Sequence, residues 1–164
     1  HLYWNPIRPH LKSLQAFLLL TAIHKFVDAR GLQGAPVVVL GDFNSLPDSG
    51  VYQLLTTGHL GTDHPHHPVA FGHKTCGEMA SPLPPLSSIH TPEPPLTTKV
   101  PTFHGTIDYV FVSPGCRVLT TLAMPYSSAD GSDIGPLPDP TGVFPSDHLA
   151  VGADIALPPP PTPQ

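Results

Sequence analysis

The feature that most constrains the fold is a short apolar run that ends in an acid and an amide. Pro36–Leu40 is uniformly apolar and β-branched, which is typical of a strand buried on both faces of a layered α/β fold. It leads directly into Gly41, Asp42, Phe43 and Asn44. Because side chains alternate across a strand, Asp42 and Asn44 point to one side and Phe43 points back to the core.

Two interpretations of this acid–amide pair compete. Asp and Asn are common turn residues, because their side chains hydrogen-bond to nearby backbone groups. Alternatively, a carboxylate and an amide side by side at the carboxyl end of a buried strand can hold a hard cation or a phosphoryl oxygen. Other polar residues in the chain are needed to decide between them.

Periodicity predicts one long helix near the start of the chain. Leu11, Leu14, Phe17 or Leu18, and Phe26 recur at helical spacing, which predicts an amphipathic helix over Pro9–Ala29. Four further elements are expected: a short helix over Val51–Leu55 capped by Asp48 or Ser49, and strands over Thr106–Val112, Arg117–Met124 and Leu149–Ile155.

Charge and hydropathy argue against two classes of protein: those that bind nucleic acid through bulk positive charge, and those that span a membrane. With 7 basic and 12 acidic residues the formal net charge is −5, so the chain does not hold nucleic acid by bulk positive charge. If it acts on a polyanion, a metal ion must neutralise the phosphate locally. No stretch reaches the ~18 apolar residues of a membrane span. The chain begins at His1 rather than at Met, so we expect it to be part of a longer protein.

Two further polar positions are candidates for chemistry. Asp108 lies within an apolar strand, where an acid is costly unless it is paired; it either caps a neighbouring turn or accepts a bond from a histidine N–H. His148 follows Asp147 at the entrance to the last strand, and histidine suits proton transfer near neutral pH. The histidine-rich sequence "TDHPHH" could form a metal cluster, but a solvated loop is the favoured interpretation.

Taken in order, these motifs resemble the endonuclease/exonuclease/phosphatase superfamily. The motifs are G-D-x-N at Gly41, G-x-I-D-Y-V-F at Gly105, and S-D-H-L-A at Ser146. The sequences "HLYWNP", "GDFNSLPDSGVYQLL" and "FPSDHLAV" are similar to the branch that contains carbon catabolite repressor deadenylases, nocturnin, Angel proteins and the 2′-phosphodiesterase. The resemblance covers only the carboxyl-terminal half of that catalytic domain.

The resemblance implies a fold and its boundaries. We expect the carboxyl-terminal half of a four-layer α/β sandwich of the deoxyribonuclease I type, with a mixed sheet and helices on one face. The partial domain would span residues 1–157. It would contain a mobile, Pro-rich insert over about residues 71–98, and a disordered Pro-rich tail would follow at 158–164.

The resemblance also implies a phosphodiester-cleaving site with one or two Mg²⁺ ions, for which Mn²⁺ could substitute. Asp42 would bind the metal and help to position the attacking water, with Asp147 beside it. Asn44 would hold a phosphate oxygen. His148 would contact the scissile phosphate, and Asp108 would orient His148.

Three further residues are implied as substrate contacts. His1 would contact phosphate, while Pro6 and Phe103 would pack against the base being removed. The intact enzyme would then be a 3′-5′ exoribonuclease that removes poly(A) tails from RNA. Such an enzyme would be cytoplasmic or nuclear and would not associate with a membrane. Deadenylase scaffold proteins would recruit it through regions outside this chain.

Two departures from the family pattern keep alternatives open. The family's main metal-binding Glu belongs to the amino-terminal half, and the only glutamates here, Glu78 and Glu93, fall in the insert. Where deadenylases carry an Asn before the stacking Phe, this chain has Thr98 or Lys99. The alternatives are a nocturnin-like or 2′-phosphodiesterase-like enzyme acting on a small nucleotide, mitochondrial in the latter case, and a truncated or degenerate module without catalysis.

Overall fold

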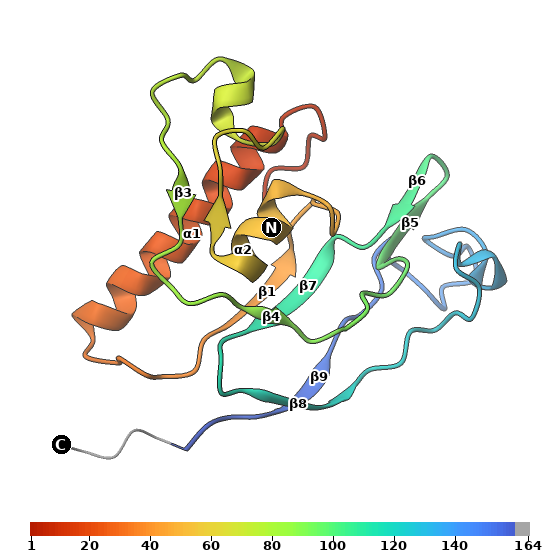
Figure 1. Ribbon diagram of the computed structural model, residues 1–164. Helices are drawn as coiled ribbons and strands as arrows, with labels where there is room; N and C mark the ends of the chain where they lie inside the picture. Colours follow the sequence, from red (N-terminus) through yellow and green to blue (C-terminus); the bar gives the residue numbers. More distant parts are fainter. Residues whose placement is uncertain (160–164) are drawn as a thin grey trace.

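The computed structural model describes residues 1–159, which form helices and short strands around a small central sheet (Figure 1). The helices are α1 (Pro9–Ala29) and α2 (Gly50–Thr57), with short 3-10 helices η1 (Pro68–Phe71) and η2 (Ser132–Ile134). The strands are β1 (Val38–Asp42), β2 (His59–Leu60), β3 (Met79–Ala80), β4 (Ser87–Ser88), β5 (Thr98–Val100), β6 (Phe103–Gly105), β7 (Asp108–Val112), β8 (Arg117–Thr121) and β9 (Ala153–Ala156).

The central sheet has the strand order β1-β7-β4, and three strand pairs, β2-β3, β5-β6 and β8-β9, lie around it. One face of this sheet packs against α1 and α2, through a core that includes Val39, Phe43 and Phe111. The opposite face of β7 packs against β8 and β9. The α/β class with helices on one face is therefore confirmed. The pairs within residues 1–159 are antiparallel, so the mixed pairing that we expected is not seen there.

The prediction that the apolar strand is buried on both faces was wrong. Val39 is buried against the helices, whereas Val38 and Leu40, on the other face, are 39% and 68% exposed. The reason is that β1 is an edge strand, and the β8–β9 pair covers the side chains of β7 rather than those of β1. Val38, Leu40 and Asp42 therefore share an accessible face of the sheet.

Helix α1 has the predicted bounds but not the predicted buried face. Leu11, Leu14, Leu18 and Phe26 are exposed, whereas Phe17 packs partly against the core. The buried positions of the helix include Ser13, Ala16 and Leu20. Because α1 is apolar nearly all round, hydrophobicity alone does not select a face. Small side chains allow a close approach on the buried face: a Cβ placed on Gly50 of α2 would lie only 3.0 Å from Ser13 Oγ.

The Pro-rich segment is packed against the core rather than mobile. Leu83, Leu86, Ile89 and Leu96 are buried, and β3 and β4 lie within this segment. Tyr52 on α2 donates a hydrogen bond from its hydroxyl to Glu93 at 2.8 Å. The Pro-rich composition of the segment predicted a mobile linker, but leucines spaced along it pack into the core and hold it in place. The predicted disordered tail, 158–164, falls mostly on residues 160–164, which lie outside the described residues.

The last two predicted strands are shorter than expected. β8 ends at Thr121, and β9 begins at Ala153 rather than at Leu149. Leu149 instead donates its backbone N–H to the carbonyl of Thr97 at 2.8 Å, so the start of the predicted strand pairs with the segment that leads into β5. No helix within residues 1–159 is long and apolar enough to cross a membrane.

The buried face of α1 can be tested by enlarging one small residue. In the full-length protein, Ala16→Leu should lower the free energy of unfolding by about 1–3 kcal/mol, because Ala16 is fully buried and the added atoms have no space. Leu18→Ala, at a position 56% exposed, should change it by less than about 0.5 kcal/mol. Chemical denaturation measures both, and the reverse ranking would restore the face predicted from the sequence.

Candidate active site

The turn after β1 fixes the orientation of the Asp42 carboxylate. Asn44 donates its backbone N–H to Asp42 Oδ1 at 2.7 Å and its Nδ2 to Oδ2 at 2.8 Å. Asn44 adopts a left-handed backbone (φ 48°), which is uncommon for a residue other than glycine. The turn interpretation of Gly-Asp-x-Asn is therefore correct, and the same turn presents Asp42 at the sheet edge beside Asn44.

The Asn44 amide has little donor capacity left for a ligand. Its Nδ2 also donates to the carbonyl of Leu2 at 3.0 Å, so both amide protons are used. The group that remains is Oδ1, which is an acceptor. For Asn44 to hold a phosphate oxygen, as the sequence predicted, one of these two hydrogen bonds would have to be released.

Asp108 begins β7 directly opposite Asp42 in the β1–β7 register. In antiparallel strands, residues opposite each other share a face and lie close together. Two carboxylates in this position repel each other. Burial is the main influence on the pKa of Asp108 and raises it; the charge of Asp42 acts in the same direction, against hydrogen bonds from Thr97 and His148. The pair lines a surface hollow of about 170 Å³.

The structure brings Asp108 and His148 together, as the family resemblance implied. His148 Nδ1 lies 2.9 Å from Asp108 Oδ2 and 3.1 Å from Oδ1. Burial acts to lower the pKa of His148, but the hydrogen bond and negative charge of Asp108, with Asp42 and Asp147 nearby, outweigh it and raise this pKa. The contact places a proton on Nδ1 and leaves Nε2 for a ligand.

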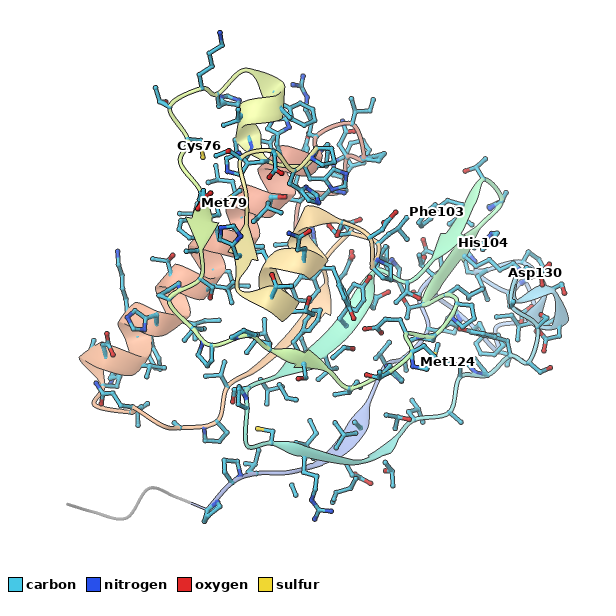
Figure 2. All side chains as sticks on the ribbon, in the orientation of Figure 1. Cys76, Met79, Phe103, His104, Met124 and Asp130 are labelled. Carbon is cyan, nitrogen blue, oxygen red and sulfur yellow. The ribbon has the colours of Figure 1, made fainter. Side chains whose placement is uncertain are left out.

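Asp147 is held by its backbone at the base of the β5–β6 hairpin. Its carbonyl accepts the Thr98 hydroxyl at 2.9 Å and the Lys99 N–H at 3.0 Å. The same hairpin carries Phe103 and His104 outward (Figure 2). The hairpin and the His148 segment therefore form one unit, and the role of the Asp147 carboxylate as a metal ligand stays a prediction.

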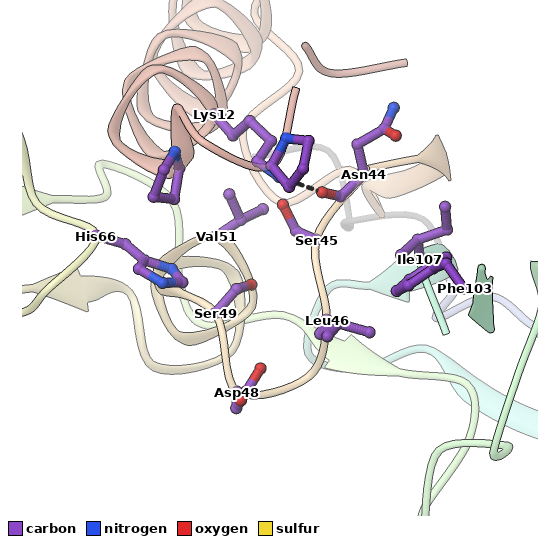
Figure 3. A pocket seen from close by; sticks show the side chains of 12 residues that line it. Lys12, Asn44, Ser45, Leu46, Asp48, Ser49, Val51, His66, Phe103 and Ile107 are labelled. Atoms are coloured by element: carbon purple, nitrogen blue, oxygen red, sulfur yellow. Dashed lines mark hydrogen bonds between the residues drawn. The ribbon is translucent and has the colours of Figure 1, made fainter. Parts of the chain in front are cut away.

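A pocket of about 180 Å³ lies beside Asn44 (Figure 3). It includes Pro6 and Phe103, the two residues expected to pack against a base. The remaining lining residues are Pro9, Lys12, Ser45, Leu46, Asp48, Ser49, Val51, His66 and Ile107. His1 does not line this pocket; it lies with Asp42 on a separate hollow of about 230 Å³. The structure thus groups Pro6, Asn44 and Phe103, and places His1 on another side of Asp42.

Lys12 is a site residue that the sequence analysis missed. It is 6% exposed in the first turn of α1, and its Nζ donates to the carbonyl of Asn44 at 2.5 Å. Burial lowers the pKa of Lys12, and the charge of Asp42 opposes this. A cation at a helix N-terminus is unfavourable, and a buried cation is costly. A lysine at this position of a predicted helix was the signal that could have identified it.

The histidine-rich segment is neither a metal cluster nor a solvated loop. His67 is fully buried, and its Nδ1 accepts the backbone N–H of Val69 at 3.2 Å. His64 Nδ1 accepts from His66 at 2.9 Å, and His66 Nδ1 accepts from Gly50 at 3.1 Å. Each imidazole is therefore part of the local backbone hydrogen bonding. Within residues 1–159, no group of three or more His, Cys, Asp or Glu side chains is placed to hold a metal ion.

The side chains near Asp42 offer the oxygen atoms that a hard cation prefers, but too few of them to complete its coordination. Carboxylate oxygens and a carboxamide oxygen suit Mg²⁺, and a cation between Asp42 and Asp108 would offset their repulsion. Neither glutamate of the chain is near: Glu78 lies 3.2 Å from His59, and Glu93 accepts from Tyr52. Residues 1–159 thus supply only part of a magnesium coordination sphere.

The chain thus combines a layered α/β domain with an acid–amide turn and an Asp–His pair at one sheet edge. The chain belongs to the Endonuclease/Exonuclease/phosphatase family, whose sequence model matches residues 17–148. Curated relatives include the Arabidopsis thaliana "Carbon catabolite repressor protein 4 homolog 4", 33% identical over 96% of this chain and 36% of the relative. The Mus musculus "2′,5′-phosphodiesterase 12" is 30% identical over 94% of this chain and 25% of the relative.

Solved structures confirm the fold. ANGEL2, described as a 2′,3′-cyclic phosphatase in complex with adenosine-2′,3′-vanadate, aligns with a TM-score of 0.75 and 26% identity, covering 94% of this chain and 54% of that one. The human nocturnin catalytic domain aligns with a TM-score of 0.58 at 21% identity and supports the fold alone. The chain spans 25–36% of the two curated relatives and about half of the ANGEL2 chain.

The Asp108–His148 contact predicts a change in the pKa of His148. Because the charge and hydrogen bond of Asp108 raise this pKa, Asp108→Asn should lower it, and a smaller fraction of His148 should be protonated at neutral pH. NMR titration of the metal-free, full-length protein measures this shift. Asp154→Asn, an exposed change on β9, is the control and should leave the pKa of His148 unchanged. An unchanged pKa in Asp108→Asn would contradict the pairing.

Proposed function

We propose that the full-length protein is a divalent-metal-dependent phosphodiesterase, and that it is a 3′-5′ exoribonuclease that removes poly(A) from RNA. The observation that carries the proposal is the placement of Asp42, Asn44, Asp108 and His148 at one sheet edge, beside a pocket flanked by Pro6 and Phe103. The similarity to proteins named as carbon catabolite repressor 4 homologues supports the choice of RNA. Recruitment by deadenylase scaffold proteins, in the cytoplasm or nucleus, belongs to the same proposal.

Each residue receives a role that its contacts allow. Asp42, with Asp147 and ligands from elsewhere in the full-length protein, holds Mg²⁺ or Mn²⁺, which when bound stabilises negative charge on the phosphate. Asp42 and the Asn44 oxygen position the attacking water. His148 presents Nε2 to the scissile phosphate, because Asp108 occupies Nδ1. Nε2 donates a hydrogen bond when the imidazole is protonated, and the raised pKa of His148 favours that form. Pro6 and Phe103 pack against the terminal base, and His1 contacts a neighbouring phosphate.

A second candidate is an enzyme acting on a small nucleotide, such as a 2′,5′-linked oligoadenylate. The poly(A) assignment lacks one expected contact, because neither Thr98 nor Lys99, at the position of the deadenylase Asn, lines the pocket. The Thr98 hydroxyl donates to the Asp147 carbonyl, and Lys99 Nζ donates to the Gly131 carbonyl at 2.5 Å. The similarity to a protein named 2′,5′-phosphodiesterase 12 supports this candidate.

Asp42→Ala in the full-length protein should abolish phosphodiester cleavage, because it removes a metal-binding carboxylate whose charge stabilisation is worth several kcal/mol. Thermal unfolding should change little, since Asp42 is only half-buried at the end of its strand.

The assay compares poly(A) RNA, 2′,5′-oligoadenylate and NADP with and without Mg²⁺. Cleavage of 2′,5′-oligoadenylate or NADP in preference to poly(A) would support the second candidate, and a wild-type protein inactive on all three would support a module without catalysis.

Phe103→Ala should raise the KM for oligonucleotides roughly 5- to 150-fold, since stacking on one base is worth about 1–3 kcal/mol. The matched control is Phe26→Ala on α1, which removes another exposed phenylalanine, distant in sequence from the pocket lining. Steady-state kinetics separates KM from kcat. An equal effect of both substitutions would show that Phe103 does not contact the base.

A further inference from the structure

Thr97 joins the strand that carries Asp108 to the segment that carries His148. It is fully buried, immediately before β5. Its backbone N–H donates to the Gly105 carbonyl at 2.9 Å, and its carbonyl accepts the N–H of Leu149 at 2.8 Å. The backbone of Thr97 is therefore hydrogen-bonded through its N–H to the strand that leads to Asp108, and through its carbonyl to the residue next to His148.

The Thr97 hydroxyl makes a second connection to the start of β7. The direction of its hydrogen bond to Asp108 follows from the number of donor and acceptor sites that a hydroxyl has. The backbone N–H groups of Ile107 and Asp108 both donate to Thr97 Oγ1 at 3.0 Å. A hydroxyl has one donor and two acceptor sites. With both acceptor sites used, its hydrogen is directed to Asp108 Oδ2, which lies 2.7 Å away. All of its hydrogen-bonding capacity is thus committed to the start of β7.

Asp108 Oδ2 is also the oxygen that lies closest to His148 Nδ1, at 2.9 Å. The carboxylate of Asp108 could turn about its terminal torsion, since such torsions are broad. The donor on Oδ2 restrains that rotation and keeps the carboxylate aimed at the imidazole. We propose that Thr97 is a positioning residue for phosphodiester cleavage, which holds the Asp108 carboxylate against His148 Nδ1 so that Nε2 faces the substrate. The catalytic part of this inference rests on the function proposed above.

The experiment compares Thr97→Val with Thr97→Ser in the full-length protein. Valine keeps the shape and removes the hydroxyl, whereas serine keeps the hydroxyl. With bis(p-nitrophenyl) phosphate, a phosphodiester probe independent of the natural substrate, Thr97→Val should lower kcat about 10-fold or more with little change in KM. Thr97→Ser should restore kcat to within about 3-fold of the wild type, because its hydroxyl can make the same three bonds.

Thr106→Val is the matched control. Thr106 is also buried, and its hydroxyl donates to the carbonyl of Pro94 rather than to a carboxylate. It should reduce stability, though less than Thr97→Val does, because its hydroxyl makes one hydrogen bond rather than three, and it should not lower kcat. Equal losses of kcat in the two variants would reduce Thr97 to a structural role. If Thr97→Val does not fold, Thr97→Cys replaces it, because a thiol is a weak donor of similar size; its kcat should fall below that of Thr97→Ser.

A spectroscopic readout separates this inference from the proposed function. At fixed pH, the Nδ1–H proton of His148 should give a downfield NMR resonance in the wild type and in Thr97→Ser, and this resonance should weaken or move upfield in Thr97→Val or Thr97→Cys. If the wild type cleaves no phosphodiester, the proposed function fails while this resonance still tests the positioning. An unchanged resonance in the variant that lacks the hydroxyl, or full kcat in that variant, would overturn the inference.

Discussion

The antiparallel pairing of β1 with β7 is the constraint on which the rest of the site depends. It sets Asp42 opposite Asp108 although the two residues are far apart in the sequence. The helices pack on the other face of this pair, through Phe43 and Phe111. The sheet therefore separates a dry, helix-covered side that provides stability from an open side that carries the acidic groups. Two like charges at one level of a strand pair are unfavourable alone, which is consistent with a site that takes a cation.

A second pairing adds the histidine. The segment 147–149 bonds to the strand that leads into the β5–β6 hairpin, through Thr97, Thr98 and Lys99. This strand also supplies the hydroxyl that meets Asp108. The hairpin that carries Phe103 is thus continuous with the backbone that supports His148. Base packing and phosphate contact, in the proposed function, are supported by one piece of chain, which fixes the distance between them.

Short motifs and local periodicity predicted much of this arrangement. The bounds of α1 and a cap of α2 at Asp48 or Ser49 follow from residue order and spacing, and Ser49 is the cap. The Asp108–His148 contact was implied by the family resemblance. The buried face of α1 could not be predicted, because it depends on the close approach of Ser13 to a glycine on another helix. Thr97 acts through contacts made only in the folded chain, so it belongs to no motif that a sequence displays. The one sequence signal of Lys12 was a cation in the first turn of a predicted helix.

Two histidines of the "TDHPHH" segment give this part of the molecule a chemical weakness. In His64 and His66, Nδ1 must stay unprotonated to accept a backbone N–H, and burial lowers the pKa of both residues. The contribution of these two residues to stability is present at neutral pH and is lost as the pH falls below about 6.5, the ordinary value for histidine. Mild acid would therefore weaken the hydrogen bonds of this segment, including the one that His66 accepts in the wall of the pocket.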